Sequence, residues 1–171
     1  SKFDVLMAVY HKDDAKLFKS AISTIFANTL QPNRIILVCD GPLSGELSNY
    51  VYSLERNPIF NIIKLPVNIG LAGALNAGLE HIESKFAFRC DADDLNHIDR
   101  FSKTLPFLLT GFDVVGSNIN EIDKSGIKLA KKIVPEEDLD IKKRIPHRNP
   151  INHMTVGFNV DSVKSVGCYP S

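Results

Sequence analysis

The feature that most constrains this chain is a regular alternation of short apolar runs with longer amphipathic stretches. Four runs have the length of a strand and are apolar on both faces; they span 3–9, 34–39, 59–65 and 86–90. Strands of this kind are typical of parallel sheets that helices cover on both sides. The β-α-β-α-β-α-β order therefore predicts a doubly wound, mostly parallel α/β sheet with right-handed crossovers.

The stretches between the runs have helical spacing. The first follows Asp13 and Asp14, which stand in a capping position, and the third is built from small residues over 68–79. A less regular second half follows the fourth run. Its predicted elements are a helix over 101–109, a strand over 112–116, a hairpin turn around Asp123-Lys124-Ser125-Gly126, a charged segment over 136–144 and a final strand over 154–160.

Composition limits the class of protein. The chain has 171 residues, and 44% of them are apolar, which fits a single domain (1–171) with one core. Its 20 basic and 20 acidic side chains balance. This balance excludes the strong basic field that nucleic-acid-binding and anionic-lipid-binding proteins carry, so no nucleic-acid partner is expected.

The cysteines and the absence of long apolar runs indicate a compartment. Cys39, Cys90 and Cys168 are widely spaced and form no CxxC pair, so we predict reduced thiols in the core. No apolar run approaches the roughly 18 residues of a membrane span, and the sequence opens on a strand-like run rather than a signal peptide. The expected location is the cytoplasm, with the inner face of the membrane as an open alternative.

Polar residues gather where the predicted strands end. Tyr10 follows the first run, Asp40 the second and Asn68 the third, and the acidic stretch 91–94 follows the fourth. In parallel sheets, ligands bind at this edge.

The acidic stretch indicates a divalent cation. In an extended segment Asp91 and Asp93 share a face, while Asp94 points elsewhere. Two close carboxylates repel unless a proton or cation lies between them, and hard oxygen ligands suit Mg²⁺ or Mn²⁺. A structural alternative is that Asp94 or Asn96 only caps the next helix.

Other candidates have two interpretations each. Asp40 could bind a nucleobase or ribose, or only form an Asx turn before Gly41. Tyr10 could stack on a base or cover the sheet edge. His153 could contact a phosphate or metal, or belong to a surface loop, and the same holds for His147. The arginines Arg100 and Arg148 are candidates for phosphate binding or for exposed ion pairs.

At this point the sequence resembles glycosyltransferase family 2, the inverting, nucleotide-sugar-dependent enzymes of the GT-A fold. The resemblance rests on four pieces in order: Met7-Ala8-Val9-Tyr10, Cys39-Asp40-Gly41, the 68–78 segment, and Arg89-Cys90-Asp91-Ala92-Asp93-Asp94, which resembles the family's DxD motif. GxGxxG and GxxxxGK[ST] are both absent from the sequence, which argues against a dehydrogenase and a P-loop enzyme. The stretches 113–117 and 149–156 also resemble members that assemble bacterial polysaccharides.

The resemblance implies a site and a reaction. Asp40 would bind uracil or its equivalent, Asp91 the ribose side of the donor, and Asp93, with Asp91, a Mn²⁺ or Mg²⁺ ion at the diphosphate. The implied donor-binding residues are Ala8, Tyr10, Asp40, Asn68, Asn76, Asp91, Asp93 and His153. The implied activity is transfer of a sugar, with UDP as the expected nucleotide, to a saccharide or lipid-linked acceptor in polysaccharide biosynthesis, with peripheral membrane association as an open alternative.

The chain departs from the family pattern near its end. The family's catalytic carboxylate follows a Gly-aromatic turn, and this chain stops at such a turn, 167–171. We therefore expect residues 1–100 to bind the nucleotide sugar, residues 101–171 to begin the acceptor part, and the base to lie beyond residue 171. Asp94, Asp99 and His153 are fallback candidates for the base.

Two other functions fit the predicted fold less well. A sugar nucleotidyltransferase needs a glycine-rich basic loop after the first strand, where this chain has Tyr10-His11-Lys12-Asp13-Asp14. A non-enzymatic, metal-dependent receiver module needs acidic residues after the first and third strands, whereas the acidic stretch here follows the fourth.

Overall fold

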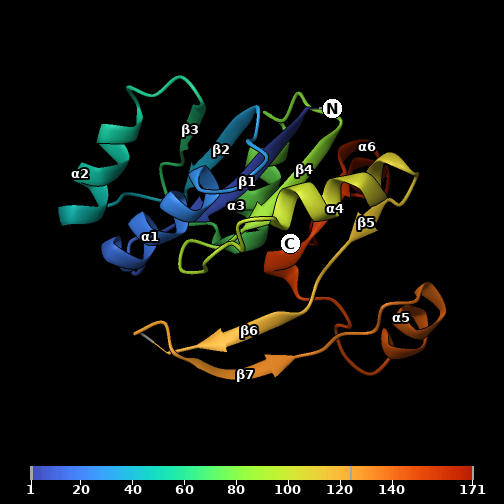
Figure 1. The fold of residues 1–171 in the computed structure, drawn as a ribbon. Coiled ribbons are helices and arrows are strands. Elements are labelled where there is room, and N and C mark those ends of the chain that lie inside the picture. The colour runs from blue at the N-terminus through green and yellow to red at the C-terminus, as the bar shows by residue number, and fades with distance from the viewer. Residues whose placement is uncertain (1, 124, 171) are drawn as a thin grey trace.

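A central sheet of six strands organises the chain (Figure 1); the computed structural model describes residues 2–123 and 125–170. Its order is β3-β2-β1-β4-β8-β5. The first four strands of the chain are parallel, and β8 pairs antiparallel with both β4 and β5. This confirms a doubly wound, mostly parallel sheet with strands β1 (Phe3–Val9), β2 (Arg34–Cys39), β3 (Phe60–Lys64), β4 (Phe86–Cys90), β5 (Val114–Val115) and β8 (Gly157–Asn159).

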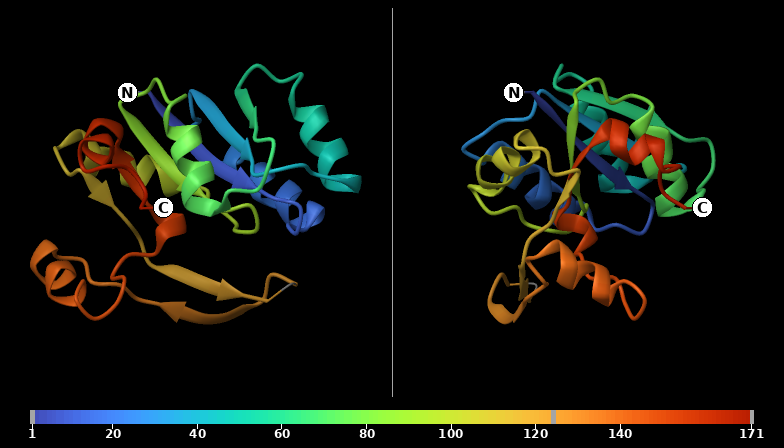
Figure 2. Two further views of the ribbon diagram at one scale, coloured as in Figure 1. Left: turned by 180° about the vertical axis from the view of Figure 1, so that it is seen from behind. Right: turned by 90° about the vertical axis from the view of Figure 1, so that its right-hand side faces the viewer.

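Helices cover both faces of the sheet (Figure 2). On β1, Val5 and Met7 point to one core and Leu6 and Ala8 to the other, so both faces of the strand are apolar as predicted. The first core includes α1 (Ala15–Phe26), α2 (Gly45–Leu54) and α4 (Arg100–Leu109); the second includes α3 (Gly70–Leu79) and α6 (Val160–Ser165).

The small residues of α3 let it pack closely on the sheet. A Cβ atom at Gly78 would collide with Leu6 and would lie 2.9 Å from Cγ2 of Val38. The helix starts at Gly70, whose φ of 82° suits glycine. Asn68 and Ile69, which the sequence placed in the helix, therefore belong to the loop before it.

The strand order creates a switch point between β1 and β4. The chain proceeds from β1 through β2 to β3 and then returns by α3 to the other side of β1. The connections on the two sides of this point lead away from each other, which leaves room for a ligand at the carboxyl ends of the strands. Most of the predicted site residues lie at this edge.

The predicted strand over 154–160 is wrong in its first half. A 3₁₀ turn, η1 (His153–Thr155), comes first, because Thr155 turns back and donates hydrogen bonds from its amide and its hydroxyl to the Asn152 carbonyl, 3.0 and 2.8 Å long. Only β8 is extended, and the helix α6 after it was not predicted. The predicted strand over 112–116 is also shorter, since only β5 pairs.

The predicted hairpin exists and lies apart from the main sheet together with a short helix (Figures 1 and 2). Its strands are β6 (Ile119–Ile122) and β7 (Lys128–Lys132), and α5 (Asp138–Arg144) follows. Oδ1 of Asp123 accepts hydrogen bonds from the amides of Ser125 (2.8 Å) and Ile127 (2.9 Å), which shapes the turn. Lys124, part of the predicted turn, lies outside the described residues.

Two further sequence predictions concern cysteines and membrane spans. All three cysteines are free thiols; Cys39 and Cys90 are buried as predicted, whereas Cys168 is only half-buried at the edge of the second core. Within residues 2–123 and 125–170, every helix is too short or too polar to cross a bilayer.

Candidate functional site

A cleft of about 340 Å³ lies at the switch point, at the carboxyl ends of the parallel strands. It brings together most of the side chains that the sequence predicted for a donor site. The lining residues come from the ends of β1, β2 and β4, the loop after β1, the turn after β4, the loop before α3 and the first turn of α3: Ala8, Val9, Tyr10, Asp13, Asp40, Asn68, Gly70, Leu71, Arg89, Asp91, Ala92 and Asp93.

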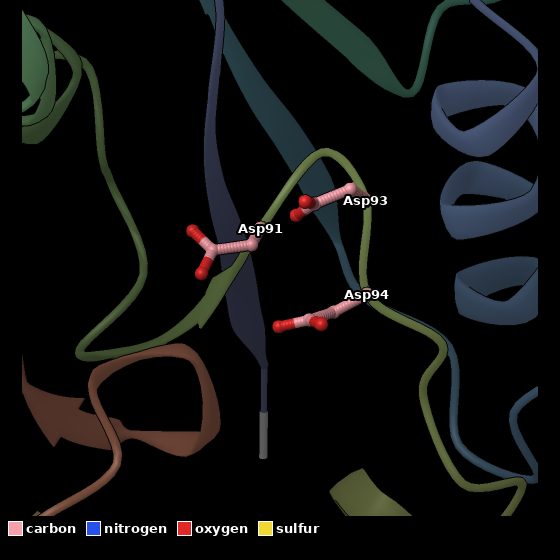
Figure 3. Close-up of side chains that lie close together, drawn as sticks. All are labelled: Asp91, Asp93 and Asp94. Carbon is pink, nitrogen blue, oxygen red and sulfur yellow. The ribbon is translucent and has the colours of Figure 1, made fainter. Parts of the chain in front are cut away.

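The acidic turn after β4 forms one wall of the site (Figure 3). Asp91, Asp93 and Asp94 each offer a carboxylate oxygen, and these oxygens lie within 4.8 Å of one another. The prediction that Asp94 points elsewhere is wrong, because the chain bends after Cys90 instead of continuing as a strand. Strand alternation therefore no longer applies, and a third carboxylate joins the pair.

Burial and neighbouring negative charge perturb Asp94. The pKa of Asp94 is raised from 3.8 to about 6, first by burial and then by the charges of Asp91 and Asp93. A cation bound between close carboxylates offsets their mutual repulsion. The donor set of three carboxylates suits Mg²⁺ or Mn²⁺, which prefer oxygen ligands.

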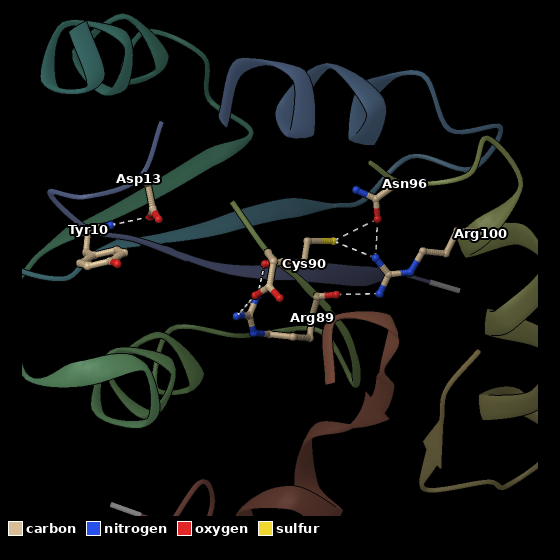
Figure 4. Close-up of polar contacts among 7 residues, drawn as sticks. Tyr10, Asp13, Arg89, Cys90, Asn96 and Arg100 are labelled. Carbon is tan, nitrogen blue, oxygen red and sulfur yellow. Dashed lines mark hydrogen bonds and ion pairs between the residues drawn. The ribbon is translucent and has the colours of Figure 1, made fainter. Parts of the chain in front are cut away.

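Sequence reasoning missed Asp13, a further carboxylate at the cleft (Figure 4). Its Oδ2 accepts a hydrogen bond of 2.9 Å from the amide of Tyr10. Burial raises the pKa of Asp13, the Tyr10 hydrogen bond lowers it, and Asp93 and Asp91 raise it further. The pair Asp13-Asp14 was interpreted as a helix cap, but only Asp14 caps α1, through bonds to two amides of the first turn.

The carboxylate of Asp40 bonds the loop before α3 rather than the residues that follow it, so the Asx turn considered for it is not what the structure shows. Its Oδ1 accepts a 2.7 Å hydrogen bond from the amide of Ile69, and its carbonyl accepts one of 3.1 Å from the side chain of Asn68. These bonds fasten the loop before α3 to the end of β2. Gly41 lets the loop come this close, because a Cβ there would lie 2.8 Å from the Asn68 amide, and its φ is 87°. Asp40 also lines the cleft.

Two arginines hold the end of β4 from opposite faces of the sheet (Figure 4). Arg89 is buried and bonds to the Cys90 carbonyl and to the carboxylate of Asp91. Arg100 reaches the same strand end from α4, donates to the Arg89 carbonyl over 2.6 Å and bonds Oδ1 of Asn96. The sequence suggested that Arg100 binds phosphate or forms an exposed ion pair. In the structure its terminal nitrogens instead bond neighbouring groups of the fold.

Asn76 and His153 lie outside the set of cleft-lining residues. The side chain of Asn76 bonds the amide and the carbonyl of Tyr169, each over 2.9 Å, and so fastens the C-terminal turn to α3. His153 packs edge-on against the Tyr169 ring, 5.3 Å between centroids. Burial and the nearby charge of Arg89 lower its pKa, which keeps the imidazole neutral at pH 7.

The remaining candidates also lie outside the cleft lining. Asp99 stands at the start of α4 and pairs with Lys103 over 3.3 Å. His147 and Arg148 are exposed in the segment after α5. The polar character of that segment predicted a surface loop as readily as a site, and the structure places it at the surface.

The raised pKa of Asp94 predicts a pH-dependent stability. The pKa of Asp94 in the folded state, about 6, lies above the unfolded value of 3.8. Its contribution to the free energy of unfolding is therefore fully present below pH 3.8 and is lost as the pH rises through 6. In EDTA, we therefore expect the Tm of Asp94→Asn to gain on that of the wild type between pH 4 and pH 7. Differential scanning calorimetry measures this; a constant Tm difference over that range would contradict the assigned shift.

Comparison with known proteins places the sequence in a family. The profile described as "Glycosyl transferase family 2" matches residues 4–162. A UDP-Gal:alpha-D-GlcNAc-diphosphoundecaprenol beta-1,3-galactosyltransferase of Escherichia coli is 34% identical over 98% of this chain and 62% of its own length. The amylovoran biosynthesis glycosyltransferase AmsE of Erwinia amylovora is 33% identical, over 98% and 63%. The chain thus spans less than two thirds of the length of these relatives.

Solved structures share the fold at low sequence identity. S. aureus TarS 1–349 in complex with UDP-GlcNAc superimposes with a TM-score of 0.75 and 18% identity over 99% of this chain and 48% of that one. The mannosyltransferase PcManGT of Pyrobaculum calidifontis, in complex with GDP-Man and Mn²⁺, gives 0.70 and 16% over 99% and 47%. The likeness confirms the predicted GT-A-type fold.

Proposed function

Because the chain belongs to glycosyl transferase family 2, we propose that its cleft binds a nucleotide-sugar donor, with UDP as the nucleotide. The observation that supports this most is that the acidic turn of β4 and the polar residues after β1, β2 and β3 face one cleft at the switch point. The name of the Escherichia coli relative specifies UDP-Gal, and TarS 1–349, which shares the fold, was crystallised with UDP-GlcNAc; both support the choice of base.

The roles proposed for the side chains follow from their places in the cleft. Tyr10, 37% exposed, offers a ring face to the base, and Asp40 lies across the edge of the sheet from it as a hydrogen-bond acceptor. Asn68 shapes the base pocket through its bond to Asp40. Asp91 accepts from the ribose, and Ala8 leaves room beside it because its side chain is a single methyl group.

A divalent cation fits the residues present. Asp93 and Asp94, with Asp91 beside them, would hold Mn²⁺ or Mg²⁺, which when bound offsets the charge of the donor's diphosphate. Asp93 is the exposed one of the three and lines the cleft. The solved structure of PcManGT in complex with GDP-Man and Mn²⁺ supports this metal in a protein of the same fold.

For the whole protein we propose an inverting transfer of the sugar to a saccharide or lipid-linked acceptor in surface polysaccharide synthesis, in the cytoplasm or at the inner face of the membrane. Residues 1–100 supply donor binding, and residues 101–171 begin the part that meets the acceptor. In a single displacement, a base must take the proton of the acceptor hydroxyl as the bond to the anomeric carbon forms. The cleft residues contribute by binding the donor and orienting its diphosphate.

A panel of nucleotides tests donor binding. A ligand at one hundred times its Kd stabilises a protein by about 2.7 kcal/mol, which raises the Tm of a chain of this size by about 5–10 °C. We expect UDP with Mn²⁺ to give this rise, and UDP with EDTA or GDP with Mn²⁺ to give much less. If only a nucleoside triphosphate with a sugar phosphate, or only acetyl phosphate, raised the Tm, the proposal would be wrong and a nucleotidyltransferase or a receiver module would be favoured.

A further inference from the structure

Among residues 2–123 and 125–170, the largest fully buried side chain is a charged one, and it lies directly behind the acidic turn. Arg89 is 1% exposed and stands two residues before Asp91, on the face of β4 that points to α3. Burying a guanidinium is costly unless its charge is paired. The structure provides one partner for that charge, the carboxylate of Asp91.

The contacts of Arg89 fix its own guanidinium and the carboxylate of Asp91. One terminal nitrogen donates to the carbonyl of Cys90, and the other pairs with Oδ1 of Asp91. The Asp91 side chain remains 27% exposed, so it bridges the buried arginine and the open cleft. One oxygen of Asp91 is thus engaged from behind, which restricts the rotamers that present the other.

Arg89 itself has almost no surface to offer a ligand. Its Nε is buried and makes no hydrogen bond within residues 2–123 and 125–170, and its terminal nitrogens are engaged with the strand end. Arg100, on the opposite face, bonds the backbone of the same strand end at the Arg89 carbonyl and the side chain of Cys90 at Sγ (3.2 Å). The strand tip is therefore held rigidly beneath the turn.

The three carboxylates of the turn differ in whether a basic side chain pairs with them. Asp91 has an ion pair, whereas none of the ion pairs found among the described residues includes Asp93 or Asp94. Arg89 offsets one negative charge and leaves the other two carboxylates for a cation. In metal sites, removing a partner that orients a ligating side chain typically costs 10–100-fold in metal affinity or activity, and we expect a comparable effect on a donor that Asp91 holds.

We propose that Arg89 is a positioning residue: through its ion pair it fixes the carboxylate of Asp91 in the orientation that binds the donor, and it does not contact the donor itself. This inference rests on the proposed function, because the donor is the nucleotide sugar proposed for the cleft. An arginine that lines such a cleft could instead bind the phosphates directly, and the proposed positioning role differs from that one.

A double-mutant cycle on UDP affinity tests the positioning role. Isothermal titration calorimetry in excess Mn²⁺ gives the Kd of the wild type, Arg89→Gln, Asp91→Asn and the double variant. We expect Arg89→Gln to weaken binding by about tenfold or more and to have almost no further effect when Asp91 is already Asn. Arg89→Lys, which keeps the charge, should recover much of the affinity. Arg34→Gln removes an exposed arginine paired with Glu83 and serves as the matched control.

An equal loss of affinity on both backgrounds would overturn the proposal, since Arg89 would then act on the donor independently of Asp91. Unchanged affinity in Arg89→Gln would overturn it as well. If the wild type bound neither UDP nor any other nucleotide of the panel, the proposed function would fail instead.

The ion pair is tested separately without nucleotide. Asp91→Asn leaves the buried arginine without its counter-charge, so we expect its Tm to fall by about 5 °C or more. Asp93→Asn removes an exposed charge from a crowded cluster, so its Tm should be unchanged or higher. Equal shifts in the two variants would contradict the ion pair, and this comparison remains informative even if Arg89→Gln does not fold.

Discussion

Replacing Asp93 with alanine is expected to abolish the stabilisation that UDP and Mn²⁺ together give the protein. The wild type should gain about 5–10 °C in Tm at one hundred times Kd, and Asp93→Ala less than about 1 °C under the same conditions. The physical reason is that Asp93 is the most exposed carboxylate of the turn and faces the cleft. Without Asp93 the site binds the cation more weakly, so repulsion between the diphosphate and the remaining carboxylates is no longer offset.

Thermal denaturation with and without ligand measures this change, and the ligand-free Tm tests whether the variant is folded. Because Asp93 is exposed and its carboxylate lies among like charges, the ligand-free Tm should not fall. Asp161→Ala, an exposed aspartate on α6 outside the cleft lining, is the matched control and should keep the full response. A variant that responded like the wild type would remove Asp93 from the site.

The second large effect is expected from Phe88→Ala, in the core beneath the site. Phe88 is fully buried on β4, with its ring centroid 5.0 Å from those of both Phe3 and Phe101. Truncating a buried phenylalanine costs about 3–5 kcal/mol in the free energy of unfolding, which lowers Tm by about 10 °C. The fit is tight, because a Cβ at Gly157 on the neighbouring strand would lie 2.6 Å from the Phe88 ring.

Urea denaturation of Phe88→Ala and of Phe107→Ala compares the same substitution at a buried and at an exposed position. Phe107 lies on α4 and is 54% exposed, so its replacement should cost less than about 1 kcal/mol. If the two variants lost equal stability, the aromatic cluster of Phe3, Phe88 and Phe101 would not be the core that supports β4.

The parallel half of the fold was predictable because its strands are apolar on both faces. The run from Phe3 to Val9 has this pattern, and the structure confirms it as β1 with its predicted bounds. The second half was less predictable, since its elements depend on contacts between side chains and backbone. The turn at 153–155 forms because Thr155 donates hydrogen bonds to the Asn152 carbonyl. The spacing of apolar residues in the sequence does not indicate such a bond.

The site was predictable where it depends on strand ends and not where it depends on turns. Topology alone brings Tyr10, Asp40 and Asp91 to one edge, and the structure places them in one cleft. The convergence of Asp94 with the other carboxylates could not be predicted, because it needs the bend after β4. Asn76 was predicted for the site but bonds the C-terminal turn, a contact 93 residues away in sequence.

The most direct test of the central claim is a crystal structure with UDP and MnCl₂, with data collected at the manganese absorption edge. We expect an anomalous peak within coordination distance of a carboxylate oxygen of Asp93 and of the diphosphate, with the uracil beside Asp40 and Tyr10. A nucleotide bound in the cleft with no manganese at the acidic turn, or manganese bound elsewhere on the protein, would contradict it.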